Sequence, residues 1–200
     1  MRTTITLGGH DVPAFESRGT ADGPRVAVLG GVHGCEYSSI AAVIRLMRGL
    51  GEHTGTVVGV PVVSMDSFTQ RSPFVVPEDG QNLNRAFPGD PDGSYTDRLA
   101  HDIFTQLIEP ADAVLDLHGG DLVEALEPFA IYNDARSRDL AAPADGFLLH
   151  LALRRPLAAL PERVTDVRHR PLDFRLGVSL RLHAVGTIRS SSGSPTRSIR

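Results

Sequence analysis

Residues 25–36 read RVAVLGGVHGCE and join a buried strand to a polar turn. The run 25–31 is almost wholly apolar and ends in two glycines, which is typical of a parallel strand covered on both faces. His33 and Glu36 follow directly, three residues apart, ahead of a segment with helical spacing. In open α/β sheets, functional groups gather beyond the carboxyl ends of the strands. This stretch therefore predicts an α/β fold with polar chemistry at one edge of the sheet.

The flanking sequence supplies the rest of the sheet and its helices. Apolar residues at three- and four-residue intervals predict a helix over 37–50, and Ser94 with Asp97 resembles a capping box that starts a second helix before Pro110. The stretch 66–93 is rich in Pro, Gly, Asn and Asp, which predicts a long loop that is either functional or disordered. The order of elements predicts a mixed, mostly parallel sheet flanked by helices. Strands are expected at residues 3–7, 12–15, 25–31, 56–65, 113–117 and 128–132.

Composition narrows the function classes for this chain of 200 residues. Its net charge of −4 combines an acidic part before residue 141 with a basic part after it, where arginines lie among Leu, Pro and Ala without interleaved aromatic residues. We therefore expect no nucleic-acid binding. No apolar run approaches the roughly 18–20 residues of a membrane span, and no signal-peptide pattern is present. With Cys35 as the single cysteine, the sequence predicts a cytoplasmic protein without disulfides.

A second polar turn, DLHGGD at residues 116–121, follows another predicted strand. Together the two turns offer His33, Glu36 and His118, and two His with one Glu is a ligand set of catalytic zinc. Asp116 is a reasonable partner to hold the tautomer of a ligating imidazole. The alternative interpretation is that the histidines are unrelated polar residues in glycine turns. Cys35 is expected to pack as a small residue, and the other six histidines have no partner at ligand spacing.

The predicted loop contains RSPFVVPEDGQNLNRAFPG at residues 71–89. Arg85 can make a bidentate contact to a carboxylate with Asn84 donating beside it, and Arg71 can stabilise an oxyanion. The alternative is a solvated loop whose arginines pair with Glu78 and Asp79. A phosphate cradle is a poor interpretation of the first glycine turn, because it lacks both the P-loop lysine and a dinucleotide-binding glycine spacing.

Three stretches, GVHGCE at 31–36, NLNRAFPG at 82–89 and DLHGGD at 116–121, occur in this order. Their order and spacing resemble the succinylglutamate desuccinylase/aspartoacylase family of the zinc carboxypeptidase superfamily, over about residues 20–135. The resemblance implies a zinc carboxypeptidase-like fold and hydrolysis of an amide bond in small N-acylated amino acids or related molecules. It also implies that His33, Glu36 and His118 hold one zinc ion. It implies further that Asn84 and Arg85 bind a substrate carboxylate and that Arg71 lies near the scissile carbonyl.

One expected element of that family is missing. Its general base is a glutamate in a Glu-Ala-Gly-Gly-like stretch, whereas Glu162, the one glutamate after residue 127, has no such neighbours. Periodicity is lost near residue 140, so we expect a hydrolase domain over 1–140 and a divergent or frame-altered, partly disordered tail over 141–200. A genuine tail that places another acid in the site is the alternative. Two functions stay open: a zinc-dependent deacylase acting on a small acylated substrate, or a non-catalytic zinc-binding family member.

Overall fold

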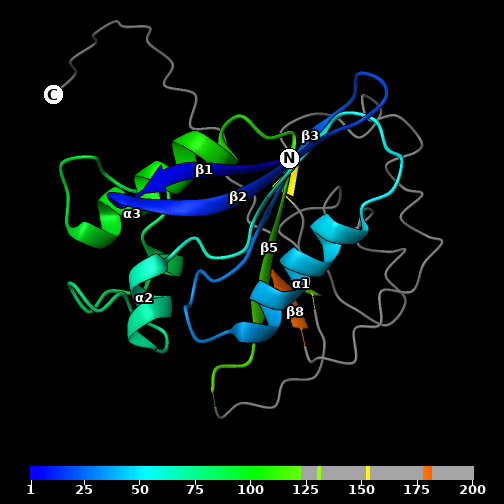
Figure 1. Ribbon diagram of the computed structural model, residues 1–200. Helices are drawn as coiled ribbons and strands as arrows, with labels where there is room; N and C mark the ends of the chain where they lie inside the picture. Colours follow the sequence, from blue (N-terminus) through cyan, green and yellow to red (C-terminus); the bar gives the residue numbers. More distant parts are fainter. Residues whose placement is uncertain (123–129, 132–151, 154–177, 182–200) are drawn as a thin grey trace, which may run out of the picture.

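The structure is a computed structural model that describes residues 1–122, 130–131, 152–153 and 178–181 (Figure 1). The described strands form one mixed sheet in the order β1-β2-β4-β3-β5-β8-β6, with β7 also paired to β5. The central strands β4, β3 and β5 are parallel, and antiparallel pairs lie on both sides of them. The strands are β1 (Arg2–Leu7), β2 (His10–Arg18), β3 (Arg25–Leu29), β4 (Thr56–Val60), β5 (Ala113–Gly119), β6 (Ala130–Ile131), β7 (Ala152–Leu153) and β8 (Val178–Arg181).

Helices cover both faces of this sheet, which confirms the predicted architecture (Figure 1). Successive side chains of β3 point to opposite faces, so Val28 packs with Val43 of α1 while Leu29 packs in the cluster of Leu99 and Ile103 of α3. The two clusters pack against the central strands from opposite faces. The helices are α1 (Tyr37–Gly49), α2 (Met65–Gln70) and α3 (Tyr95–Ile103), with a 3₁₀ turn at Leu83–Arg85 and a π-helical segment at Phe104–Ile108 that continues α3.

The end of the predicted strand 56–65 was wrong. Strand β4 ends at Val60, and Met65 begins the short helix α2 inside the stretch expected to be strand and loop. Pro61 follows β4 directly, and its ring removes the backbone donor that a continuing strand would need. The rest of 66–93 is irregular apart from the 3₁₀ turn. The predicted capping box is confirmed, since the Ser94 hydroxyl accepts from the Asp97 backbone while the Asp97 carboxylate accepts in return.

Residues 130–131 form β6 within the predicted strand 128–132. The proposed boundary at residue 140 and Glu162 lie outside the described residues, and of 141–200 the structure describes only β7 and β8. In the described part of the chain, no helix has the length and apolarity needed to cross a membrane.

Candidate metal centre

Parallel pairing of β3 and β5 brings the two polar turns together. Leu29 at the end of β3 lies opposite Asp116 in β5, so His33 and His118 both follow this register point at the same edge of the sheet. His118 is held within β5 itself, whereas His33 and Glu36 lie in the turn between β3 and α1. The structure therefore brings these residues to one edge of the sheet, as their positions after the strands predicted.

The first turn depends on two glycines. Gly31 has a φ of 62°, a left-handed conformation that side-chain-bearing residues rarely adopt. Gly34 lies against α2, and a Cβ there would come within 2.1 Å of the Ser67 carbonyl carbon. Glu36, two residues later, is the N-cap residue of α1 and makes no side-chain cap hydrogen bond. The Glu36 carboxylate therefore points away from its own helix toward the histidines.

Glu36 lies between the two imidazoles. Its Oε1 is 2.7 Å from His33 Nδ1, and its Oε2 is 2.9 Å from His118 Nδ1. One donor atom from each of the three residues lies within 4.8 Å of the others, so they could hold a metal ion. All three are buried, with 7%, 4% and 3% of the residue exposed for His33, Glu36 and His118.

Further groups fix the orientation of each ligand candidate. His118 Nε2 lies 2.9 Å from Asp116 Oδ2, as expected from the sequence, and His33 Nε2 lies 3.1 Å from Asn82 Oδ1. The backbone N–H of Gly119 donates to Glu36 Oε2 at 3.0 Å. Metal-ligating histidines usually make such a bond with their second nitrogen, which sets the tautomer. Asn82 was missed from the sequence, because its contact depends on the path of the 71–89 loop.

The charges of Glu36 and His118 stabilise each other. Burial works to raise the pKa of Glu36, but hydrogen bonds and charge from His118 and His33 lower it overall. Burial works to lower the pKa of His118, but the Asp116 and Glu36 carboxylates raise it to about 10. The carboxylates of Glu36 and Asp116 thus place negative charge around His118. The donor set, its burial and its outer partners thus fit a zinc ion bound by two imidazoles and one carboxylate.

Asn84 and Arg85 lie beside this centre on the 3₁₀ turn. Asn82 Oδ1, which contacts His33, also accepts from the Asn84 backbone N–H at 2.9 Å. The Asn84 side chain is buried, yet among the described residues neither its Nδ2 nor its Oδ1 has a hydrogen-bond partner. Leaving a buried amide group unpaired costs about 1–3 kcal/mol. The Arg85 side chain is exposed and donates to the Asn84 carbonyl at 3.2 Å.

Arg71 is the left-handed C-cap of α2, with a φ of 54° and an exposed side chain. Within residues 1–122, no hydrogen bond or ion pair links it to the His33–Glu36–His118 group. Its charge does act on buried Cys35, where it opposes the rise in the thiol pKa that burial and Asp121 cause. Arg71 is thus near the turn, and among the described residues it makes no hydrogen bond or ion pair with the three ligand candidates.

The alternative pairing of the loop arginines with Glu78 and Asp79 is not what the structure contains. Asp79 instead accepts hydrogen bonds from the backbone and hydroxyl of Thr96, at 2.8 and 2.6 Å. Glu78 accepts from Gln70 at 3.2 Å. The acidic residues therefore fasten the loop to α2 and α3, and the two arginines are left for other contacts.

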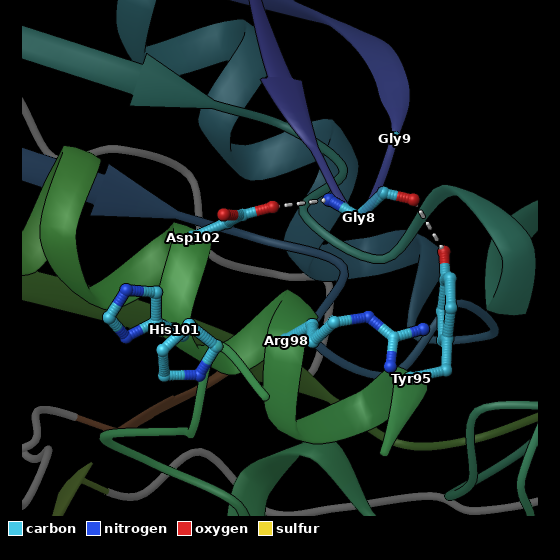
Figure 2. A pocket seen from close by; sticks show the side chains of 7 residues that line it. Gly8, Gly9, Tyr95, Arg98, His101 and Asp102 are labelled. Atoms are coloured by element: carbon cyan, nitrogen blue, oxygen red, sulfur yellow. Dashed lines mark hydrogen bonds between the residues drawn. The ribbon is translucent and has the colours of Figure 1, made fainter. Parts of the chain in front are cut away.

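A cavity of about 300 Å³ lies elsewhere, between the β1–β2 turn and α3 (Figure 2). Its polar groups bond mostly to one another: Asp102 accepts from the Gly8 N–H at 2.9 Å, and the Tyr95 hydroxyl lies 3.2 Å from the Gly8 carbonyl. Tyr95 also donates to Asp66, which pairs with His10 at 3.0 Å. His10 was expected to lack a partner at ligand spacing. These contacts attach the hairpin to α2 and α3 and do not include the metal centre.

Sequence comparison identifies relatives of this chain. Residues 22–154 match the family model for the succinylglutamate desuccinylase/aspartoacylase catalytic domain. A curated relative, the N-alpha-acetyl-L-2,4-diaminobutyric acid deacetylase of Halomonas elongata, is 43% identical over 112 residues. The match covers 54% of this chain and 32% of the relative, so the chain spans about a third of the relative's length.

Solved structures of low sequence identity share the fold. A succinylglutamate desuccinylase/aspartoacylase from Rhodobacter sphaeroides is 24% identical with a TM-score of 0.62, over 90% of this chain and 55% of that one. An aspartoacylase family protein from Mesorhizobium loti is 23% identical with a TM-score of 0.64, over 90% and 60%. A metallo-carboxypeptidase from Pseudomonas aeruginosa is 16% identical with a TM-score of 0.58, over 90% and 54%.

Proposed function

This chain belongs to the succinylglutamate desuccinylase/aspartoacylase family, and on that premise we propose that it is a zinc-dependent hydrolase. It cleaves the amide bond of a small N-acylated amino acid or amine, and it acts in the cytoplasm. The observation that carries the proposal is the buried group of His33, Glu36 and His118, whose donor atoms lie within 4.8 Å of one another. A carboxylate and two imidazoles buried at one point would be costly without a bound cation or protons to balance the charge.

The outer partners prepare this group for a metal. With its Nε2–H donated to Asp116, His118 would offer the Nδ1 lone pair to a metal in place of the present contact with Glu36, and the Asn82 contact would do the same for His33. Zinc bound by His33, Glu36 and His118 supplies a Lewis acid and lowers the pKa of water to about 7. Glu36 supplies the negative charge that keeps such a cation in place.

The remaining site residues act on the substrate. The unpaired Nδ2 of Asn84 can donate a hydrogen bond to a substrate carboxylate. The exposed Arg85 guanidinium can form charge-assisted hydrogen bonds with the same carboxylate. Arg71 supplies a positive charge near the first turn, where it would stabilise the oxyanion that develops as the amide carbonyl is attacked. These contacts hold the substrate by its carboxylate while the carbonyl faces the three ligands.

The curated relative suggests a first substrate to test. That relative is named for the deacetylation of N-alpha-acetyl-L-2,4-diaminobutyric acid, a small N-acylated amino acid of the class proposed here. We propose the same compound, or a close analogue, as a substrate of this protein.

A metal-binding protein without turnover is the second candidate. Among residues 1–122, Glu36 is the carboxylate that joins the two histidines, and the sequence contains no match to the family's general-base stretch. General acid–base help is worth about 10²–10⁴-fold in rate. A chain without a base would therefore bind zinc and ligand but turn over negligibly.

The test begins with metal content. Wild type, His118→Ala and the control His101→Ala are purified. The number of zinc ions per chain is then measured by inductively coupled plasma mass spectrometry. We expect one zinc per chain in wild type and in the control, and loss of zinc in His118→Ala. Retention of one zinc by His118→Ala would refute the ligand assignment. Hydrolysis of the N-acetyl substrate by zinc-loaded wild type supports the hydrolase, whereas binding without hydrolysis supports the second candidate.

A further inference from the structure

Phe74 has an unusual combination of backbone and environment. Its φ is 62°, a left-handed conformation that is a genuine outlier for a bulky side chain. Its side chain does not compensate by entering the core, because 46% of the residue is exposed. Strain of this kind persists only where the surrounding structure imposes it, and it is concentrated at functional sites. Phe74 is therefore a candidate for a role outside stability.

The surrounding loop holds this conformation in place. The Ser72 hydroxyl donates to the Val75 carbonyl at 2.7 Å, and the Val75 N–H donates to the Pro73 carbonyl at 2.7 Å. Val76 follows as a buried residue and donates its N–H to the Gln81 carbonyl at 2.8 Å. These bonds involve the neighbours of Phe74 and not its ring, so the loop positions the ring without using it.

The ring lies beside the metal centre. It meets the His33 imidazole edge to face, with ring centroids 6.1 Å apart and an interplanar angle of 64°. His33 contacts Glu36 through Nδ1 and Asn82 through Nε2, so the phenyl ring occupies a further side of the same imidazole. An exposed apolar surface thus adjoins the group expected to face the scissile amide.

We propose that Phe74 is a specificity-determining residue that contacts the hydrocarbon part of the substrate's acyl group. This inference rests on the proposed function. A methyl or short alkyl group gains by leaving water against the phenyl ring. A carboxylate at the end of the acyl group loses hydration there, and the ring offers it no hydrogen-bond donor. The residue therefore favours small uncharged acyl groups, such as acetyl, over dicarboxylic ones, such as succinyl.

Selectivity measurements test this with or without turnover. Selectivity is measured for zinc-loaded wild type, Phe74→Ala, Phe74→Gly and the control Val75→Ala with N-acetyl- and N-succinyl-L-2,4-diaminobutyrate. It is the ratio of kcat/KM values where the protein hydrolyses the ligands, and the ratio of calorimetric binding constants where it does not. Val75 is a matched control, because its side chain is also exposed and the change keeps its backbone bonds. We expect wild type and the control to prefer the acetyl ligand. Both Phe74 variants should weaken acetyl binding by about tenfold and reduce the acetyl-to-succinyl preference.

Two further readouts exclude a merely structural role. Each variant should keep the zinc content of wild type, and Phe74→Gly should leave Tm unchanged or raise it, because glycine adopts the left-handed conformation without strain. Unchanged selectivity in Phe74→Ala, or a fall in Tm and zinc content in both variants, would overturn the proposal. If zinc-loaded wild type binds neither ligand, the proposed function fails and this inference fails with it. If wild type binds and selectivity is unaltered, only the role of Phe74 fails.

Discussion

Asp116 lies 2.9 Å from His118 on the side of the imidazole opposite to Glu36, which lies 2.9 Å from the same ring's Nδ1. The ring is therefore fixed from both nitrogens by two buried carboxylates that come from different elements. Asp116 is two residues before His118 on β5, so both point to the same face of the strand. This arrangement assigns Asp116 the task of orienting His118.

Replacing Asp116 by Asn should weaken zinc binding by about 10–100-fold, because the amide bonds the imidazole less strongly and no longer raises its basicity. Competition with a chelator of known zinc affinity measures the change. The control is Asp102→Asn, which alters a carboxylate in the separate cavity beside Gly8. Equal zinc affinity in Asp116→Asn and wild type would contradict the orienting role.

Asn82 should link the metal centre to the 3₁₀ turn Leu83–Arg85, which carries the proposed substrate-binding residues. Its Oδ1 contacts His33 Nε2 and accepts from the Asn84 N–H, so Asn82→Ala removes both contacts at once. We expect weaker zinc binding and weaker ligand binding together. Asn82→Asp keeps the oxygen acceptor and should retain zinc affinity at or above the wild-type level.

Calorimetric titration of both variants with zinc, and then with the N-acetyl ligand, checks this prediction. If Asn82→Ala loses ligand binding while its zinc affinity is unchanged, Asn82 serves the turn alone and the coupling does not exist.

The parts that could be predicted from sequence are those that follow from regular elements. His33, Glu36 and His118 stand at the ends of apolar runs, and parallel pairing then places them together. Helix α2 was missed because six residues after a strand-like apolar run contain too few turns to show a helical period.

Contacts that depend on the path of a loop could not be predicted in this way. The bond from Asn82 to His33 and the left-handed conformation of Phe74 depend on how residues 71–89 fold back over the first turn. Glycine usually marks positive φ in a sequence, and Phe74 carries no such mark. The pairing of His10 with Asp66 likewise depends on docking of the β1–β2 hairpin against α2.

The contact of Tyr95 with Asp66 should contribute to stability. The Tyr95 hydroxyl donates to the buried Asp66 carboxylate and lies close to the Gly8 carbonyl, and burial together with Asp66 raises the pKa of the phenol. Tyr95→Phe leaves Asp66 without this donor and should lower the free energy of unfolding by about 1–3 kcal/mol. Urea denaturation measures the loss. Tyr37→Phe, at a more exposed tyrosine, should change it by less than about 0.5 kcal/mol.

Asp79 should make the docking of the loop on α3 dependent on pH. Burial works to raise its pKa, but hydrogen bonds from the Thr96 hydroxyl and backbone, and from Gln81, lower it below its ordinary value of 3.8. Since the folded-state pKa lies below the unfolded one, ionised Asp79 stabilises the fold above the unfolded value, and this contribution is lost as pH falls through the folded pKa. The Tm advantage of wild type over Asp79→Asn should therefore be constant near neutral pH and shrink toward pH 3.

The control is Asp92→Asn, at an exposed acid of the same loop. The Tm advantage of wild type over this variant should be smaller and should not decline toward pH 3. A wild-type advantage over Asp79→Asn that stays constant from pH 7 to pH 3 would show that ionised Asp79 does not hold the loop to α3.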